Sequence, residues 1–116
     1  MKEVMVVEND IVLRTYITEV LQTKFEAVGV IQAISARDAA VKFHFGIDLL
    51  IMGGRRLTPE AALFLRSIKK VYGETRIIMM TSTSQEYYVD QCYDKIIYKP
   101  FALEELVNAI TPLVWH

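Results

Sequence analysis

The stretch EVMVVENDIVLRTYITEVLQTK, from Glu3 to Lys24, changes its hydrophobic pattern after the first few residues. Its first part, Val4–Val7, is apolar on consecutive residues, which is typical of a strand buried on both faces. Its second part, from about Asp10 to Lys24, has an apolar stripe at helical spacing: Leu13, Ile17, Val20 and Leu21. The stretch therefore predicts a fully buried strand followed by an amphipathic helix.

Further strands are predicted by the same kind of pattern. Three more runs are apolar on consecutive residues: Leu49–Met52, Ile77–Met80 and Ile96–Tyr98. Val28–Ala33 is a weaker candidate because it contains Gly29 and Gln32, and this composition favours the edge of a sheet.

Helices are predicted between these runs from capping residues and apolar spacing. Ser35 with Asp38 forms an N-cap pair that opens a helix through Phe43. Thr58-Pro59-Glu60 combines a cap, a proline at the first helical position and an acidic first turn. A last helix has the stripe Leu103, Leu106, Val107 and Ile110, and Pro112 is expected to close it.

Strand and helix thus alternate five times along residues 1–116, and we predict one α/β domain of that extent. The alternation is typical of a parallel sheet that is covered by helices on both faces and joined by right-handed crossovers. Ligands and chemistry gather at the carboxyl ends of such strands. The residues at those ends are Glu8-Asn9-Asp10, Gly53-Gly54-Arg55-Arg56, Thr81-Ser82 and Lys99-Pro100.

Composition excludes several classes of protein. The chain is 53% hydrophobic, which fits a compact globular domain, yet no apolar run approaches the 18 residues that a membrane span needs. The N-terminus lacks the features of a secretory signal, so the cytoplasm is the expected location. Residues 55 to 76 have a net charge of +4, from six basic and two acidic side chains. We interpret this run as a solvated helix face, and no binding of nucleic acid by this domain is indicated.

The four strand ends together resemble those of the CheY-like receiver domains of two-component response regulators, over essentially the whole chain. The matching segments are VVEND (Val6–Asp10), DLLIM (Asp48–Met52), IIMMTS (Ile77–Ser82) and YKPF (Tyr98–Phe101). The resemblance implies a flavodoxin-like, three-layer (βα)5 sandwich whose parallel five-stranded sheet has the order 2-1-3-4-5. It also implies a phosphoacceptor aspartate directly after Met52, but this chain has Gly53 there.

Gly53 removes the chemistry that the resemblance implies. In receivers the aspartate carboxylate attacks a phosphoryl group, while Mg²⁺ held by that aspartate and an acidic pair neutralises the charge. Gly53 supplies no nucleophile, and Asn9 replaces the second acid of the pair, which leaves Glu8 as the matching carboxylate. We therefore expect Mg²⁺ to bind weakly or not at all at Glu8 and Asn9, and no other cofactor. Asp10 is expected to cap the following helix instead.

Thr81 and Lys99 match the receiver hydroxyl and lysine that sense and neutralise the phosphoryl group. Without an acceptor, we favour structural roles for both: a bond from the Thr81 hydroxyl to nearby backbone, and an ion pair between Lys99 and Glu8. The resemblance also implies a cis peptide bond between Lys99 and Pro100.

The switch of receivers is altered as well. The family usually has an aromatic residue three positions before the lysine, and here that residue is Ile96, which cannot make the same rotation. The segment before it is short, with room for about two helical turns in Gln85–Gln91. Four tyrosines crowd this region and suggest an exposed interface: Tyr87, Tyr88, Tyr93 and Tyr98.

We interpret the chain as a pseudo-receiver, a signalling module that acts without phosphorylation. It would dock a protein partner or a second copy through the face formed by Gln85–Gln91, the last strand and the last helix. The alternative is a sensor of small anions, in which the Gly53-Gly54 backbone approaches an anion that Arg55, Arg56 and Lys99 neutralise. One of these arginines could instead occupy the metal position. An enzyme is not expected, because His44 and His116 are far in sequence from suitable catalytic partners.

Overall fold

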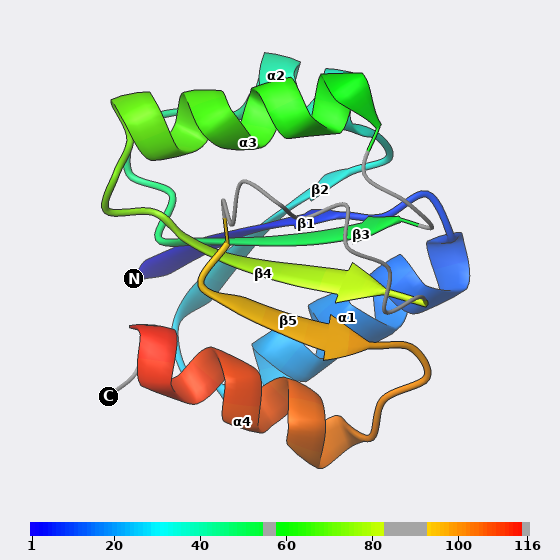
Figure 1. The fold of residues 1–116 in the computed structure, drawn as a ribbon. Helices are drawn as coiled ribbons and strands as arrows, with labels where there is room; N and C mark the ends of the chain where they lie inside the picture. The colour runs from blue at the N-terminus through cyan, green and yellow to red at the C-terminus, as the bar shows by residue number, and fades with distance from the viewer. Residues whose placement is uncertain (55–57, 83–92, 115–116) are drawn as a thin grey trace.

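The computed structural model describes residues 1–54, 58–82 and 93–114 of the chain (Figure 1). Its strands are β1 (Lys2–Val7), β2 (Val28–Ala33), β3 (Leu49–Gly54), β4 (Arg76–Thr81) and β5 (Lys95–Tyr98). Its helices are α1 (Ile11–Lys24), α2 (Ala36–Lys42), α3 (Pro59–Val71) and α4 (Leu103–Val114). The helix predicted within Gln85–Gln91 lies outside the described residues, as do Tyr87 and Tyr88.

All five strands are parallel and form one sheet in the order β2-β1-β3-β4-β5. This confirms the predicted order and the position of β2 at an edge. The register aligns Val7 with Met52, and Gly54 with Thr81. Because parallel strands all end at the same side of a sheet, the residues after β1, β3, β4 and β5 gather there.

The sheet separates two apolar cores, one on each face (Figure 1). The helices α1 and α4 cover one face, and α2 and α3 cover the other. Successive residues of β1 alternate between them: Val4 and Val6 pack toward α1 and α4, while Met5 and Val7 pack toward α2 and α3. Burial on both faces explains why the strands are apolar on consecutive residues.

Three helices begin at the capping residues that the sequence indicates. Asp10 Oδ1 accepts hydrogen bonds from the backbone N–H of Val12 and Leu13. Ser35 Oγ accepts from the Asp38 N–H, and Thr58 Oγ1 accepts from the N–H three residues further on. Each cap satisfies an N–H group that has no partner inside its helix.

The end of the last helix differs from the prediction, because α4 continues past Pro112 to Val114. A proline lacks only its own N–H, so the residues after it can still donate to the preceding turn. Val114 is buried in the core on the α1 and α4 face, and its burial favours the additional residues of helix.

Among the described residues, no helix has the length and apolarity needed to cross a membrane.

Candidate functional site

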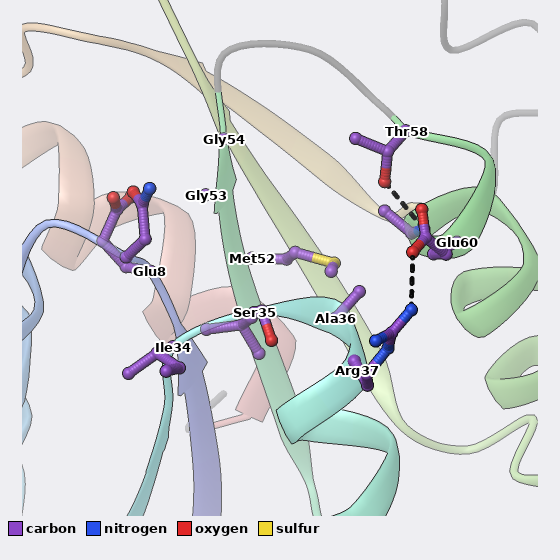
Figure 2. A pocket seen from close by; sticks show the side chains of 13 residues that line it. Glu8, Ile34, Ser35, Ala36, Arg37, Met52, Gly53, Gly54, Thr58 and Glu60 are labelled. Atoms are coloured by element: carbon purple, nitrogen blue, oxygen red, sulfur yellow. Dashed lines mark hydrogen bonds and ion pairs between the residues drawn. The ribbon is translucent and has the colours of Figure 1, made fainter.

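A pocket of about 680 Å³ opens at the carboxyl ends of β1 and β3, beside the first turns of α2 and α3 (Figure 2). Val7, Met52 and Ala61 supply part of its apolar lining. On one side an exposed ion pair joins the two helices, with Arg37 Nη2 3.3 Å from Glu60 Oε2. The pocket has the size of a small-molecule site, and its lining includes three of the residues that the resemblance to receivers singles out: Glu8, Asn9 and Gly53.

Gly53 lies at the end of β3, opposite Met80 of β4. A Cβ atom at this position would collide with Glu8 Oε1 and would lie 3.0 Å from the Cε atom of Met80. The Glu8 carboxylate therefore occupies the space in which any side chain at position 53 would begin. Glycine is favoured here by this close approach of the Glu8 side chain, and not by its backbone angles.

The Glu8 carboxylate is buried, with 2% of its residue surface exposed, and both oxygens have partners. Oε1 accepts a hydrogen bond from Lys99 Nζ at 2.9 Å and forms an ion pair with it. Oε2 accepts from the Asp10 N–H at 3.0 Å. The predicted ion pair is thus confirmed, and it joins the ends of β1 and β5 across 91 residues of sequence. A buried carboxylate needs such partners because its desolvation is costly.

Lys99 is held in place by its backbone as well as by its side chain. Its N–H donates to the Thr81 carbonyl at 2.7 Å, and its peptide bond to Pro100 is cis, as the resemblance implies. Thr81 is fully buried at the end of β4. The structural role predicted for its hydroxyl stays a prediction.

The side-chain oxygen atoms of Glu8 and Asp10 at this site already have partners within the chain. Glu8 already contacts Lys99 and the Asp10 N–H, Asn9 is exposed, and Asp10 Oδ1 caps α1. A cation would have to displace the Lys99 ammonium from the buried carboxylate. Within residues 1–54, 58–82 and 93–114, no group of three or more His, Cys, Asp or Glu side chains could hold a metal ion.

Arg14 contributes a contact that the sequence does not indicate. Its Nη1 donates to the Glu8 carbonyl at 2.7 Å, and its Nε donates to Gln32 Oε1 at 2.9 Å. Arg14 thereby joins α1 to β2 and to the backbone that precedes the site. No sequence signal could reveal this role, since it depends on how α1 packs beside the sheet.

Asp38 orders the segment between β2 and α2 that forms one wall of the pocket. Its Oδ2 accepts from the Ile34 N–H at 3.0 Å and from Lys42 Nζ at 3.0 Å. The Ile34 hydrogen bond, followed by the one from Lys42, lowers the pKa of Asp38 below its ordinary value of 3.8. Asp38 therefore remains charged, and keeps both contacts, at any pH near neutrality.

The residues around β5 differ partly from expectation. Ile96, at the switch position, is half-buried against the core on the α2 and α3 face. Tyr98 is 46% exposed, in agreement with a predicted surface role. Tyr93 is different, because it is half-buried and packs against the same core as Ile96. The prediction that Tyr93 belongs to an exposed cluster is therefore wrong in part, because the residue packs against this core and is not fully exposed.

The arginines proposed for anion binding, Arg55 and Arg56, lie outside the described residues, and so does His116. Of the described cations near the site, Arg37 pairs with Glu60 and Lys99 pairs with Glu8. The anion-sensor hypothesis therefore stays a prediction.

Comparison with known proteins shows the fold. No family model and no curated protein matches the chain. Among solved structures, the non-phosphorylated receiver domain of HemR from Leptospira biflexa matches with a TM-score of 0.84 and 17% identity, over 100% of this chain and 96% of that one. A CheY-like receiver domain protein from Methanospirillum hungatei matches with a TM-score of 0.80 and 21% identity, over 97% and 92%.

A third match is the response regulator TrrA from Thermotoga maritima, solved in complex with Mg²⁺ and BeF. It has a TM-score of 0.80 and 21% identity, over 97% of this chain and 99% of that one. These identities are low, while the similarity of the backbone extends over nearly the whole of each chain. The chain therefore has the CheY-like fold of response-regulator receiver domains.

Proposed function

We propose that this chain is a receiver-like signalling domain of a two-component pathway that acts through protein contacts and without phosphorylation. One observation supports this most directly: the Glu8 carboxylate lies over the Cα of Gly53 and pairs with Lys99. The site thus has no side chain at the acceptor position, and the carboxylate of Glu8, directly after β1, fills part of the space.

The ion pair also bears on the conformation of the domain. In receivers the lysine neutralises the negative charge of the phosphoryl group. Here Lys99 already contacts a buried negative charge that belongs to the chain itself. A permanent partner of this kind favours a single arrangement of the site, and Ile96 lacks the aromatic ring with which receivers report a change.

Several further properties belong to the same proposal. We expect Mg²⁺ binding to be weak or absent, because the ion would compete with the Lys99 ammonium for Glu8. We expect no enzymatic activity and no binding of nucleic acid by this domain. A location in the cytoplasm fits a two-component signalling role.

The proposed docking face comprises β5, α4 and the segment before them, and it would bind a protein partner or a second copy. Tyr98, on β5, is an exposed aromatic residue of the kind that interfaces favour. Receiver folds do dock on proteins: the receiver domain of Ssk1 from Saccharomyces cerevisiae, with 18% identity to this chain and a TM-score of 0.78, was crystallised with the phosphotransfer protein Ypd1.

Phosphorylation is tested by incubating the protein with Mg²⁺ and acetyl phosphate and then measuring its intact mass. A receiver that has its aspartate serves as the positive control. We expect no phosphoryl adduct on this chain. An adduct that disappears in Asp10→Asn or in Glu8→Gln would disprove the proposal, because it would identify a substitute acceptor beside Gly53.

The docking face is tested separately with Tyr98→Arg. We expect this variant to lose a partner or a self-association that the wild-type protein shows in affinity capture and in a measurement of solution mass. Ile11→Glu, an exposed substitution on α1, is the matched control and should keep the interaction. Equal binding by all three proteins would place the interface elsewhere.

A further inference from the structure

The loop between α2 and β3 presents an aromatic ring to solvent. Phe45 is 85% exposed, and no other Phe or Tyr side chain in the described part of the chain is as exposed. The loop is anchored on both sides of this ring, because Phe43 packs against the core on the α2 and α3 face and Ile47 is buried in it. Gly46 has a φ of 103°, a backbone conformation that favours glycine. Phe45 is therefore held at the surface by neighbours that are fixed in place.

A groove of about 400 Å³ opens beside this ring, between α2 and α3, which lie side by side on one face of the sheet (Figure 1). Three of its lining residues have packed rings: the Phe43 centroid lies 6.0 Å from that of Phe64 and 5.0 Å from that of Tyr72. Tyr72 also contacts Phe45, at a centroid distance of 6.4 Å. The exposed ring and the groove are therefore neighbours on one surface.

The lining of the groove favours an uncharged occupant. Its charged lining residues are Arg37 and Glu60, which form an ion pair with each other. Its other lining residues are uncharged, and Leu63 among them is 64% exposed. An apolar side chain suits such a lining better than an acidic or a basic one, because a charge there would lose water without gaining a partner. The ring of Phe45 meets this condition.

Charges of both signs flank the ring and the groove. Lys70 is exposed on α3, seven residues after Leu63 and therefore on the same side of the helix. Glu74 is exposed just after α3 and, with Phe45, lines a small cavity of about 250 Å³. Within the described residues, neither Lys70 nor Glu74 forms an ion pair. A surface that binds its own copy has to complement itself, and charges of both signs allow this.

We propose that a second copy of this chain docks on this surface across a two-fold axis, with Phe45 of each copy inserted into the groove of the other. The axis passes between Phe45 and Tyr72, so that each ring reaches the groove beside its counterpart. Lys70 of one copy faces Glu74 of the other, and this contact occurs twice in the dimer. Aromatic side chains that fill a pocket of the partner are typical of the residues that dominate binding.

The proposed interface goes beyond the function proposed above and is separate from its docking face. That face comprises β5, α4 and the segment before them, whereas α2 and α3 cover the opposite face of the sheet from α4 (Figure 1). A dimer formed through α2 and α3 therefore leaves β5 and α4 of both copies available to a partner protein.

Sedimentation equilibrium of the full chain, over concentrations of about 1–500 μM, measures self-association. We expect a reversible equilibrium between monomer and dimer for the wild-type protein. Phe45→Glu should weaken the dimer at least about tenfold, because it places a charge against the apolar lining. Ile11→Glu is the matched control: Ile11 is an exposed apolar residue on α1, and this variant should dimerise as the wild type does. Thermal unfolding checks that both variants are folded.

An exchange of charges tests the two-fold arrangement. Lys70→Glu and Glu74→Lys each bring like charges together across the axis, and each should weaken the dimer about threefold or more at low salt. An equimolar mixture of these two single variants should associate more strongly than either alone, because both contacts then join a glutamate to a lysine. High salt should reduce these differences.

Three outcomes contradict the proposal. The first is a wild-type protein that stays monomeric over the whole concentration range. The second is a dimer that Phe45→Glu leaves intact, and its loss in Tyr98→Arg would place self-association on the face formed by β5 and α4. The third is a mixture of the two charge variants that associates no better than each variant alone. None of these outcomes bears on phosphorylation at Gly53, so the two proposals can fail separately.

Discussion

The carboxylate of Glu8 lies directly over the Cα of Gly53, in the space where the Cβ of any other residue would be. Glu8 directly follows β1, and Gly53 is the last residue but one of the neighbouring strand β3; the register aligns Val7 with Met52 just before them. The absence of a side chain at position 53 thus allows a buried acid to reach Lys99. Four measurements follow from this site and from the contacts that support the sheet.

Gly53→Ala should have opposite effects in two backgrounds. Position 53 has no positive φ, so alanine would ordinarily stabilise the protein by about 0.4–1 kcal/mol through the unfolded state. In the wild-type chain the new methyl group collides with Glu8, and we expect a net loss of stability. In Glu8→Ala the collision with Glu8 is removed and the contact with the flexible Met80 side chain remains, so Gly53→Ala should stabilise the protein by at most about 0.4–1 kcal/mol. Urea unfolding of the four proteins measures this, and the same sign in both backgrounds would contradict the close approach.

The two partners of the buried ion pair should differ in their importance for stability. Lys99→Met leaves the Glu8 carboxylate buried without its cation and should cost about 2–4 kcal/mol. Glu8→Gln keeps an oxygen that can accept from the Asp10 N–H, and Lys99 is exposed enough to reach water, so we expect a loss of about 1 kcal/mol. Chemical unfolding of both variants shows which one loses more stability. A larger loss in Glu8→Gln would mean that Glu8 stabilises the site mainly in another way.

Asp94 should make stability depend on pH in the acid range. Burial acts to raise the pKa of its carboxyl, but the Ile77 N–H and the Lys69 ammonium outweigh burial and hold the pKa below 3.8. Because the folded-state pKa is depressed, this contribution is complete above the unfolded-state pKa and is lost as the pH falls through the folded-state value.

The measurement is the free energy of unfolding of wild type and Asp94→Asn between pH 7 and pH 2. The difference should be constant near neutrality and should shrink as the pH falls below about 4. Glu104→Gln, which removes an exposed acid from α4, serves as the control for net charge. A difference that grows on acidification would contradict the assignment.

Asp10 should act as a helix cap and not as a metal ligand. Asp10→Ala removes the acceptor for the first N–H groups of α1 and should cost about 1 kcal/mol. Asp10→Ser keeps a capping oxygen and should cost only a few tenths of a kcal/mol. For each variant, the loss of stability relative to wild type should be the same with and without Mg²⁺, as measured by thermal unfolding. A loss that appears only in the presence of Mg²⁺ would show that Asp10 binds the ion.

Much of the architecture could be predicted because it depends on local patterns. Consecutive apolar residues in Val4–Val7 predict a strand buried on both faces, and Ser35 and Thr58 mark helix starts through their own hydroxyl groups. Where a residue lies at the end of an element, local rules are less reliable. Pro112 was expected to stop the last helix, yet the burial of Val114 extends it. Tyr93 was expected at the surface, yet it packs inward beside β5.

The site itself was predicted only in part. The resemblance to receivers led to the prediction that Glu8 and Lys99 form an ion pair. It did not predict that the Glu8 carboxylate fills the space over Gly53. Arg14, which donates to the Glu8 carbonyl, carries no sequence signal at all. These contacts depend on strand register and on the rotamers of long side chains, which no local pattern encodes.

The amino-acid sequence by itself determined the order of strands and helices, the caps, and the lack of a nucleophile at position 53. These features follow from the periodicity of apolar residues and from the chemistry of single side chains. Only the tertiary structure decided what replaces that nucleophile, because Glu8 and Lys99 are 91 residues apart. Their contact exists because parallel pairing brings the ends of β1, β3 and β5 to one side of the sheet, where a glycine leaves room for the acid.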